Sequence, residues 1–200
     1  MIQVMGKDTS INVRKVLWCL DIIGCHYKHI NAVDVSYLKT LNPNQLVPVI
    51  IDADLVLWES NTILRYLGRK FPAENLYSDT PTEAALIDQW LDWQATTFNS
   101  SWNYAFQAIV RKNSSYSNQA EIGKSLASWN ACIELLNHHF CNLEFSTGDL
   151  FRISDIALAL SLNRWYMATG ERGKFEHVDR YYDSCSIKSC FEKRVKNGIP

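Results

Sequence analysis

Three short segments carry residue types whose spacing could do chemistry. The first is the loop Thr9-Ser10-Ile11-Asn12, which places two hydroxyls and a carboxamide just before an amphipathic helix. Free N–H groups and the helix dipole make such a helix start attractive to an anion. The loop could therefore stabilise a thiolate, while a Ser or Asn at this point is also typical of an ordinary helix N-cap.

The second segment is the apolar run Leu46-Val47-Pro48-Val49-Ile50-Ile51, in which a proline interrupts a strand pattern. Proline has no N–H to give to a β-ladder. Either the strand begins at Pro48, or the Val47–Pro48 peptide bond is cis. A cis bond would turn the N–H and C=O of Val47 outward, where they could pair with an extended peptide ligand.

The third segment is Trp58-Glu59-Ser60-Asn61, where a strand pattern ends and a helix pattern begins. Taken alone, Ser60 would cap its own helix and Glu59 would be solvated. Taken together with Pro48, the segment favours another reading, in which the helix start and the Ser60 hydroxyl hold a carboxylate of the ligand.

These segments lie among strand and helix patterns over the first seventy residues. Apolar runs at 2–5 and 27–31 predict strands, and the stretch between them has helical spacing up to Gly24. Residues 46–58 predict a β-hairpin, and a helix opens at Ser60. The order strand, helix, strand, connection, hairpin, helix is typical of a small sheet with helices packed on it.

Every pattern after Thr80 is helical. Thr80-Pro81-Thr82-Glu83 has the form of a capping box, and we expect one helix from there to about Arg111. A strongly apolar helix should lie between Asp149 and Ala168, closed by Gly170. We therefore expect an α/β domain over residues 1–76 and an all-α helical bundle over residues 82–200.

Composition narrows the class of protein and its partners. Of the 200 residues, 47% are hydrophobic and 20% charged, which excludes a disordered or collagenous chain. The net charge is −1 without a basic block, so we expect neither nucleic acid nor a membrane as partner. No secretory signal follows Met1, and we expect a cytoplasmic protein. The six cysteines form no C-x-x-C, which argues against a zinc site or dithiol redox motif.

In their order and spacing these residues resemble the cytosolic glutathione transferases, of a bacterial type. The segments that carry the resemblance run from Gly6 to Val16, from Asn42 to Val49 and from Leu57 to Leu67. It implies a thioredoxin-like first domain, a helical second domain and a homodimer. It also implies glutathione as co-substrate, no other cofactor or metal, and a hydrophobic electrophile as second substrate.

The resemblance also implies roles for single residues. Val47, before a cis Pro48, would pair its backbone with the cysteinyl unit of glutathione. Glu59 and Ser60 would hold the γ-glutamyl end, and Gln45 would reach the glycyl carboxylate. At the thiol, Ser10 is the best match to the activating hydroxyl, and Asn12 resembles a second polar group beside it. Leu46 stands where many relatives have a basic or amide side chain.

The energy needed at the thiol is modest. A free thiol has a pKa of roughly 8.5, and lowering it by about two units requires ~2.7 kcal/mol of preferential stabilisation of the thiolate. A hydrogen bond to a charged group supplies roughly 1.5–3 kcal/mol and a helix N-terminus roughly 0.3–1 kcal/mol. Ser10 and the helix dipole would therefore suffice, with the choice among Thr9, Ser10 and Asn12 left open.

The second substrate needs an apolar surface on the helical domain. Trp102, Phe106, Trp165 and Tyr166 are the candidates, although aromatic residues at helical spacing are also typical of a core. A departure from the relatives lies at Arg152, three residues before Asp155, where they have a Ser or Thr that caps the helix.

Two other functions stay open. One is a glutathione-dependent disulfide or peroxide reductase: relatives that react through their own cysteine carry it in the first loop, where this chain has Thr9 and Ser10, whereas relatives without that cysteine can reduce disulfides with two glutathiones. A non-catalytic binding module would keep the fold without the activity, which the intact Val47-Pro48 and Glu59-Ser60 pairs argue against.

Overall fold

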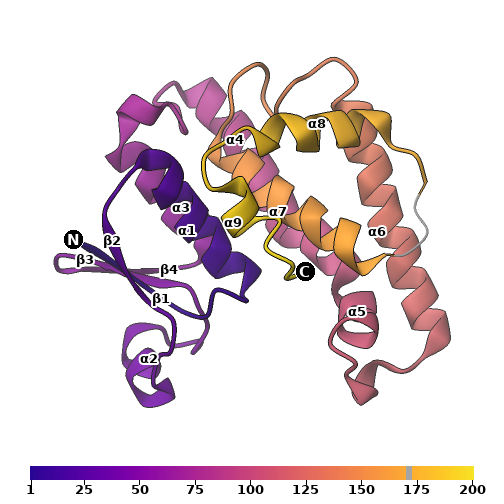
Figure 1. Cartoon of the computed structure of the whole chain (residues 1–200), viewed down its shortest axis with the longest axis horizontal. Helices are drawn as coiled ribbons and strands as arrows, with labels where there is room; N and C mark the ends of the chain where they lie inside the picture. The colour runs from indigo at the N-terminus through magenta and orange to yellow at the C-terminus, as the bar shows by residue number, and fades with distance from the viewer. Residues whose placement is uncertain (170–172) are drawn as a thin grey trace.

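The computed structural model describes residues 1–169 and 173–200. A mixed four-stranded sheet occupies one side of the molecule (Figure 1). Its strands follow the order β2-β1-β3-β4, in which β1 is parallel to β2 and antiparallel to β3, and β3 and β4 form a hairpin. The strands are β1 (Ile2–Met5), β2 (Tyr27–Ile30), β3 (Val49–Asp52) and β4 (Leu55–Trp58).

Helices cover both faces of this sheet. Helices α1 (Ile11–Ile23) and α3 (Ser60–Lys70) lie on one face, and α2 (Val35–Leu41) lies on the other (Figure 1). Alternation along the strands explains the two layers, because neighbouring strand residues point to opposite faces. Val4 belongs to the core under α1 and α3, whereas Met5 packs with Leu38 of α2.

Helix α2 is an element that the sequence analysis missed. The Asp34 side chain caps it, accepting hydrogen bonds from the N–H groups of Ser36 at 2.9 Å and Tyr37 at 3.1 Å. Its single buried residue, Leu38, fixes its position on the sheet. An Asp N-cap before an apolar residue at every third position was the signal available.

The second part of the chain is helical. Its long helices pack around α7, in which every residue from Ile153 to Trp165 is buried. The expected order of a thioredoxin-like α/β part and a helical part is confirmed. The helices are α4 (Pro81–Trp93), α5 (Asn99–Ile109), α6 (Gln119–His139), α7 (Ile153–Ala168), α8 (Glu176–Ser186) and α9 (Phe191–Arg194). The boundaries 1–76 and 82–200 stay a prediction.

Two helix starts differ from expectation. The prediction of a single helix up to Arg111 is wrong, because a π-helical turn at Gln94–Phe98 separates α4 from α5. The Thr80 side chain makes no capping hydrogen bond, so α4 begins on Pro81 without the expected capping box. Gly170, expected to close α7, lies outside the described residues.

Arg152 does not cap α7 with its side chain, as expected. The Asp155 carboxylate supplies the acceptor instead, taking hydrogen bonds from the N–H groups of Arg152 and Ser146, each at 2.8 Å. The Arg152 guanidinium points away and donates to the main-chain oxygen of Asn75 at 2.6 Å. The buried helix therefore starts normally despite the missing Ser or Thr.

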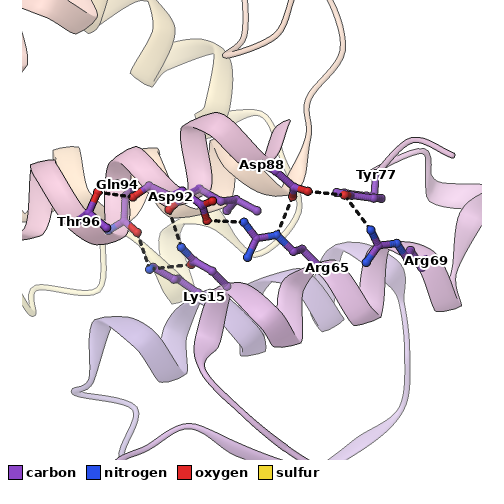
Figure 2. Close-up of polar contacts among 10 residues, drawn as sticks. Lys15, Arg65, Arg69, Tyr77, Asp88, Asp92, Gln94 and Thr96 are labelled. Atoms are coloured by element: carbon purple, nitrogen blue, oxygen red, sulfur yellow. Dashed lines mark hydrogen bonds and ion pairs between the residues drawn. The ribbon is translucent and has the colours of Figure 1, made fainter. Parts of the chain in front are cut away.

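A buried polar cluster joins α1 to the helical part (Figure 2). Lys15 donates through Nζ to Asn61 Oδ1 at 3.1 Å and to Gln94 Oε1 at 2.8 Å. Gln94 lies in the π turn and donates through Nε2 to Ser161 Oγ on α7 at 2.9 Å. The widened turn therefore brings the Gln94 amide between α1 and α7.

A second polar chain runs along the outside of α3 and α4 (Figure 2). Arg65 forms ion pairs with Asp88 and Asp92, each at 2.6 Å. The Tyr77 hydroxyl donates to Asp88 at 2.8 Å and accepts from Arg69 at 3.0 Å. Since α3 begins at Ser60, these contacts hold the helix that carries one of the predicted binding segments.

Lys15 generates a prediction about stability and pH. Burial lowers the pKa of its ammonium group from 10.5 to about 7; the Arg164 charge lowers it as well, and Glu59 opposes them. Between these values the unfolded chain binds a proton that the folded chain has lost. The contribution of Lys15 to the free energy of unfolding should therefore rise with pH, by up to about 1.4 kcal/mol per pH unit.

Urea unfolding of the native protein and Lys15→Met, with reductant present, measures this contribution. The difference in free energy between the two should grow in favour of the native protein from pH 7 to pH 10. Lys39→Met, which removes an exposed ammonium group from α2, is the control and should keep the native pH dependence. A difference that stays flat or shrinks with pH would contradict the prediction.

Candidate active site

A cleft of about 860 Å³ lies between the α/β part and the helical part. The loop from Gly6 to Asn12, helix α2 and the residues just before β3 form one wall. Side chains of α5 and α7 form the opposite wall. The cleft thus brings together two of the three sequence segments singled out for chemistry, and the third lies next to it.

Ser10 occupies the position before α1 and lines the cleft. Its backbone is extended, with φ −81° and ψ 123°, and its side chain makes no hydrogen bond to its own helix. The ordinary capping role is therefore not taken by this hydroxyl. The group stays available beside the free N–H groups of the first turn of α1.

A hydrogen bond joins the starts of α1 and α3. The Ser60 hydroxyl, on the first residue of α3, donates to Asn12 Oδ1 at 3.3 Å. This leaves the Asn12 amide nitrogen without a partner in the part of the chain that the structure describes. Ser60 is buried, and it does not cap its own helix. Asn12 thus lies between the two helix starts and faces the cleft.

Glu59 precedes α3 in an uncommon backbone conformation. Its φ is 69° and its ψ is 110°, and its side chain is exposed without a capping hydrogen bond. A positive φ in a residue with a Cβ carries strain and is found preferentially at functional sites. Neither Glu59 nor Ser60 lines the cleft itself.

The predicted cis peptide bond between Val47 and Pro48 is confirmed. The strand also begins after the proline, at Val49, so both readings of this segment describe part of the structure. Val47 lines the cleft, and neither its N–H nor its C=O forms a hydrogen bond with another described residue. Its backbone is therefore available to an extended ligand.

Gly6 allows Val47 to approach the first loop. A Cβ on Gly6 would lie 2.6 Å from Val47 Cβ and 2.6 Å from Val13 Cγ2, and its φ of 130° is one that side chains rarely adopt. Gln45 lines the same wall. Its loop is held by Asn42, whose amide donates to the main-chain oxygen of Leu46 at 2.8 Å.

The structure separates the four aromatic candidates for the second substrate. Trp102 and Phe106 of α5 line the cleft. Trp165 is 1% exposed, and its Nε1 donates to Oδ1 of Asn130 on α6 at 3.0 Å. Tyr166 lines a different cavity and donates its hydroxyl to Asp179. The last two residues are therefore not brought to the cleft.

The sequence analysis missed two arginines that complete the second wall, Arg111 and Arg164. We call these two residues, together with Trp102 and Phe106, the helical wall. Arg111 follows α5, and Arg164 lies on α7 with its guanidinium carbon 4.2 Å from the centroid of the Phe106 ring. Burial lowers the pKa of Arg164 to about 9, and the charges of Arg14 and Arg111 add to this effect. A charge in the middle of an apolar helix pattern was the available signal.

Within the described ranges, no three His, Cys, Asp or Glu side chains are placed to hold a metal ion. The helices of this part of the chain are also too short or too polar to cross a membrane. The residues that line the cleft carry hydroxyl, amide, ammonium and guanidinium groups beside aliphatic and aromatic side chains.

Comparison with known proteins gives consistent results. The family model for the N-terminal domain of glutathione S-transferase matches residues 3–69. The glutathione S-transferase GstB of Escherichia coli strain K12 is 32% identical, over 86% of this chain and 94% of the relative. A theta class glutathione S-transferase of Xanthomonas axonopodis pv. citri, crystallised with glutathione bound, is 31% identical, with a TM-score of 0.89 over 97% of this chain and 96% of that chain.

A more distant structure shows how widely the fold is shared. A delta-class glutathione transferase of Nilaparvata lugens is 18% identical and has a TM-score of 0.87, covering 100% of this chain and 95% of that one. At this identity the likeness concerns the fold alone. The identity to the Escherichia coli and Xanthomonas proteins reaches further, and the chain belongs to the glutathione S-transferase family.

Proposed function

We propose that this transferase adds the thiolate of glutathione to hydrophobic electrophiles, with glutathione as co-substrate and no further cofactor. The sulfur forms a bond to an electrophilic carbon, and a leaving group departs as its anion. The observation that carries the proposal is the Ser10 hydroxyl, which faces the cleft at the start of α1 and is not used by its own helix. It donates a hydrogen bond to the sulfur and favours the thiolate.

We propose three contacts to glutathione on the side of the α/β part, and we call this side of the site the glutathione wall. The backbone of Val47 pairs with the cysteinyl unit, Gln45 reaches the glycyl carboxylate, and Glu59 with Ser60 holds the γ-glutamyl end. The free backbone groups of Val47 support the first contact. The Xanthomonas relative, whose crystal structure contains glutathione, supports a glutathione site as a whole.

Asn12 is proposed as the second donor at the sulfur. Its Oδ1 accepts from Ser60, so its amide hydrogens are free to point into the cleft. The same hydrogen bond would couple the γ-glutamyl end of glutathione to its thiol, because Ser60 lies on the γ-glutamyl side and Asn12 on the thiol side. This coupling distinguishes Asn12 from Thr9, which lines the cleft without such a contact.

The proposal includes a homodimer, a cytoplasmic location and a role in detoxification, all of which follow from the family. Sedimentation at micromolar concentration tests the dimer. A reductase working through its own cysteine is less well supported, because no cysteine of the described chain lines the cleft. Cys19 of α1 is fully buried, and burial raises the pKa of its thiol.

Ser10→Ala tests the proposed activation of the thiol. The thiolate loses one hydrogen bond to a charged group, so kcat/KM with an aryl halide should fall ~10–100-fold at pH 6.5. The loss should shrink at high pH, where the thiol ionises unaided, and the midpoint of the pH–rate profile should move up by about one to two units. Thr9→Val is the matched control and should leave the midpoint in place. An unchanged profile for Ser10→Ala would remove Ser10 from this role.

Glu59→Gly tests whether backbone strain and binding are linked. Glycine tolerates a φ of 69°, so the variant should be more stable by about 1 kcal/mol, the strain relieved less the entropy of the added glycine. It should nevertheless bind glutathione more weakly, because the γ-glutamyl contact is lost.

Ala53→Gly is the control for the strain term, since Ala53 has a φ of 52° in the β3–β4 turn. It should gain stability without losing affinity. Thermal unfolding and calorimetric titration with glutathione measure the two quantities. Undiminished affinity in Glu59→Gly would contradict the assigned contact.

A further inference from the structure

We propose that the helical wall is an anion subsite, at which Arg164 and Arg111 select electrophiles that carry an acidic group on an apolar ring. The inference rests on the proposed function, because it names the class of the second substrate. It goes further in giving that substrate a negative charge, which a hydrophobic cleft alone would disfavour.

The first observation is a buried cation that lacks an anion. Arg164 is 4% exposed, and it forms no ion pair within the described part of the chain. Its one hydrogen bond there runs from Nη2 to the main-chain oxygen of Pro200, at 3.4 Å, and its Nε has no partner. A buried charge of this kind is costly unless it is paired. A bound anion would supply the missing partner.

The second observation is an unsatisfied donor beside it. Trp102 lines the cleft, and its indole Nε1 is buried without a hydrogen-bond partner in the described part of the chain. The Arg164 guanidinium lies 4.6 Å from the centroid of the Trp102 ring. Two unused N–H donors therefore belong to adjacent side chains of the same wall. Buried donors are normally paired, and an acceptor on a ligand bound at this wall would satisfy these two.

The charge of the whole cleft points the same way. Three cations line it, namely Lys7, Arg111 and Arg164, and no Asp or Glu of the described chain does. Arg111 is exposed and lies 5.5 Å from the centroid of the Phe106 ring, so it can reach over a bound ring. Uncompensated charge of one sign in a cleft attracts ligands of the other sign.

Glutathione has carboxylates of its own, but the proposed contacts place them away from the helical wall. Its γ-glutamyl end is assigned to Glu59 and Ser60, and its glycyl end to Gln45. The helical wall faces these groups from α5 and α7. An anion at Arg164 would therefore be a separate group, carried by the second substrate.

The pair 4-chloro-3-nitrobenzoate and 4-chloro-3-nitrobenzamide tests the proposal. In both compounds the thiolate sulfur bonds to the ring carbon that carries chlorine, the C–Cl bond breaks and chloride leaves, while the acid or amide group is unchanged. The measurement is the ratio of kcat/KM for the benzoate to that for the benzamide, each first divided by its uncatalysed rate constant with glutathione, because the amide group activates the ring more strongly than the carboxylate does. In the native protein we expect a ratio of about ten or more, as for a hydrogen bond to a charged group.

Three variants test which residues cause this ratio. Arg164→Met should lower it ~10-fold or more. Arg111→Gln should lower it about two- to fivefold, because an exposed ion pair contributes less. Lys112→Gln removes the same charge from the neighbouring exposed residue, which does not line the cleft, and should change the ratio less than about twofold. If Arg164→Met does not fold, Arg111→Gln against Lys112→Gln still decides the question.

Several results would overturn the proposal. One is a native protein without preference for the benzoate, and another is an equal fall in Arg111→Gln and Lys112→Gln. A third is a raised KM for glutathione in Arg111→Gln with an unaltered ratio, which would assign the arginine to glutathione.

A protein that turned over neither compound would contradict the proposed function and leave the subsite to be tested by binding. Calorimetry with the two preformed glutathione conjugates then gives the answer. Tighter binding of the carboxylate conjugate by about tenfold, lost in Arg111→Gln and kept in Lys112→Gln, would support the subsite. Equal binding of the two conjugates would overturn it.

Discussion

The meeting of two helix N-termini is the constraint on which the rest of the structure depends. The starts of α1 and α3 approach closely enough for Ser60 to donate to Asn12 at 3.3 Å. Their positive dipole ends repel each other, so packing must hold them together, and an anion between them is favoured. The Lys15–Asn61 hydrogen bond fastens the same two helices deeper in the core. The adjacent N-termini of α1 and α3 therefore both shape the fold and favour the binding of an anion.

The elements that the sequence predicted are those specified by local patterns. The strands and the end of α1 at Gly24 each follow from a few adjacent residues, whereas at Pro48 the local pattern left two readings open and the cis bond was favoured only together with the segment at Glu59 and Ser60. The π turn at Gln94–Phe98 does not follow from adjacent residues, because the Gln94 side chain binds Lys15 and Ser161, which are distant in sequence, as well as the nearby Asn99. A period of 3.6 continues through such a turn with little sign of the extra residue.

The two walls of the cleft differ in how far the sequence alone could predict them. The glutathione wall consists of contiguous segments, so Ser10, Val47 and their neighbours could be named from the sequence. The helical wall collects side chains from α5 and α7, and there one step along a helix changes the face by about 100°. Arg164 reaches the cleft while its neighbour Trp165 is in the core, a difference that residue type alone does not show.

The π turn has a consequence for how the protein can evolve. Five residues of π-helix turn the chain about as far as four residues of α-helix, so the extra residue hardly changes the direction in which α5 faces. A deletion within Gln94–Phe98 would therefore leave Trp102 and Phe106 on the cleft while it displaced the amide that binds Lys15 and Ser161. The substrate wall and the buried polar cluster can thus change independently of each other.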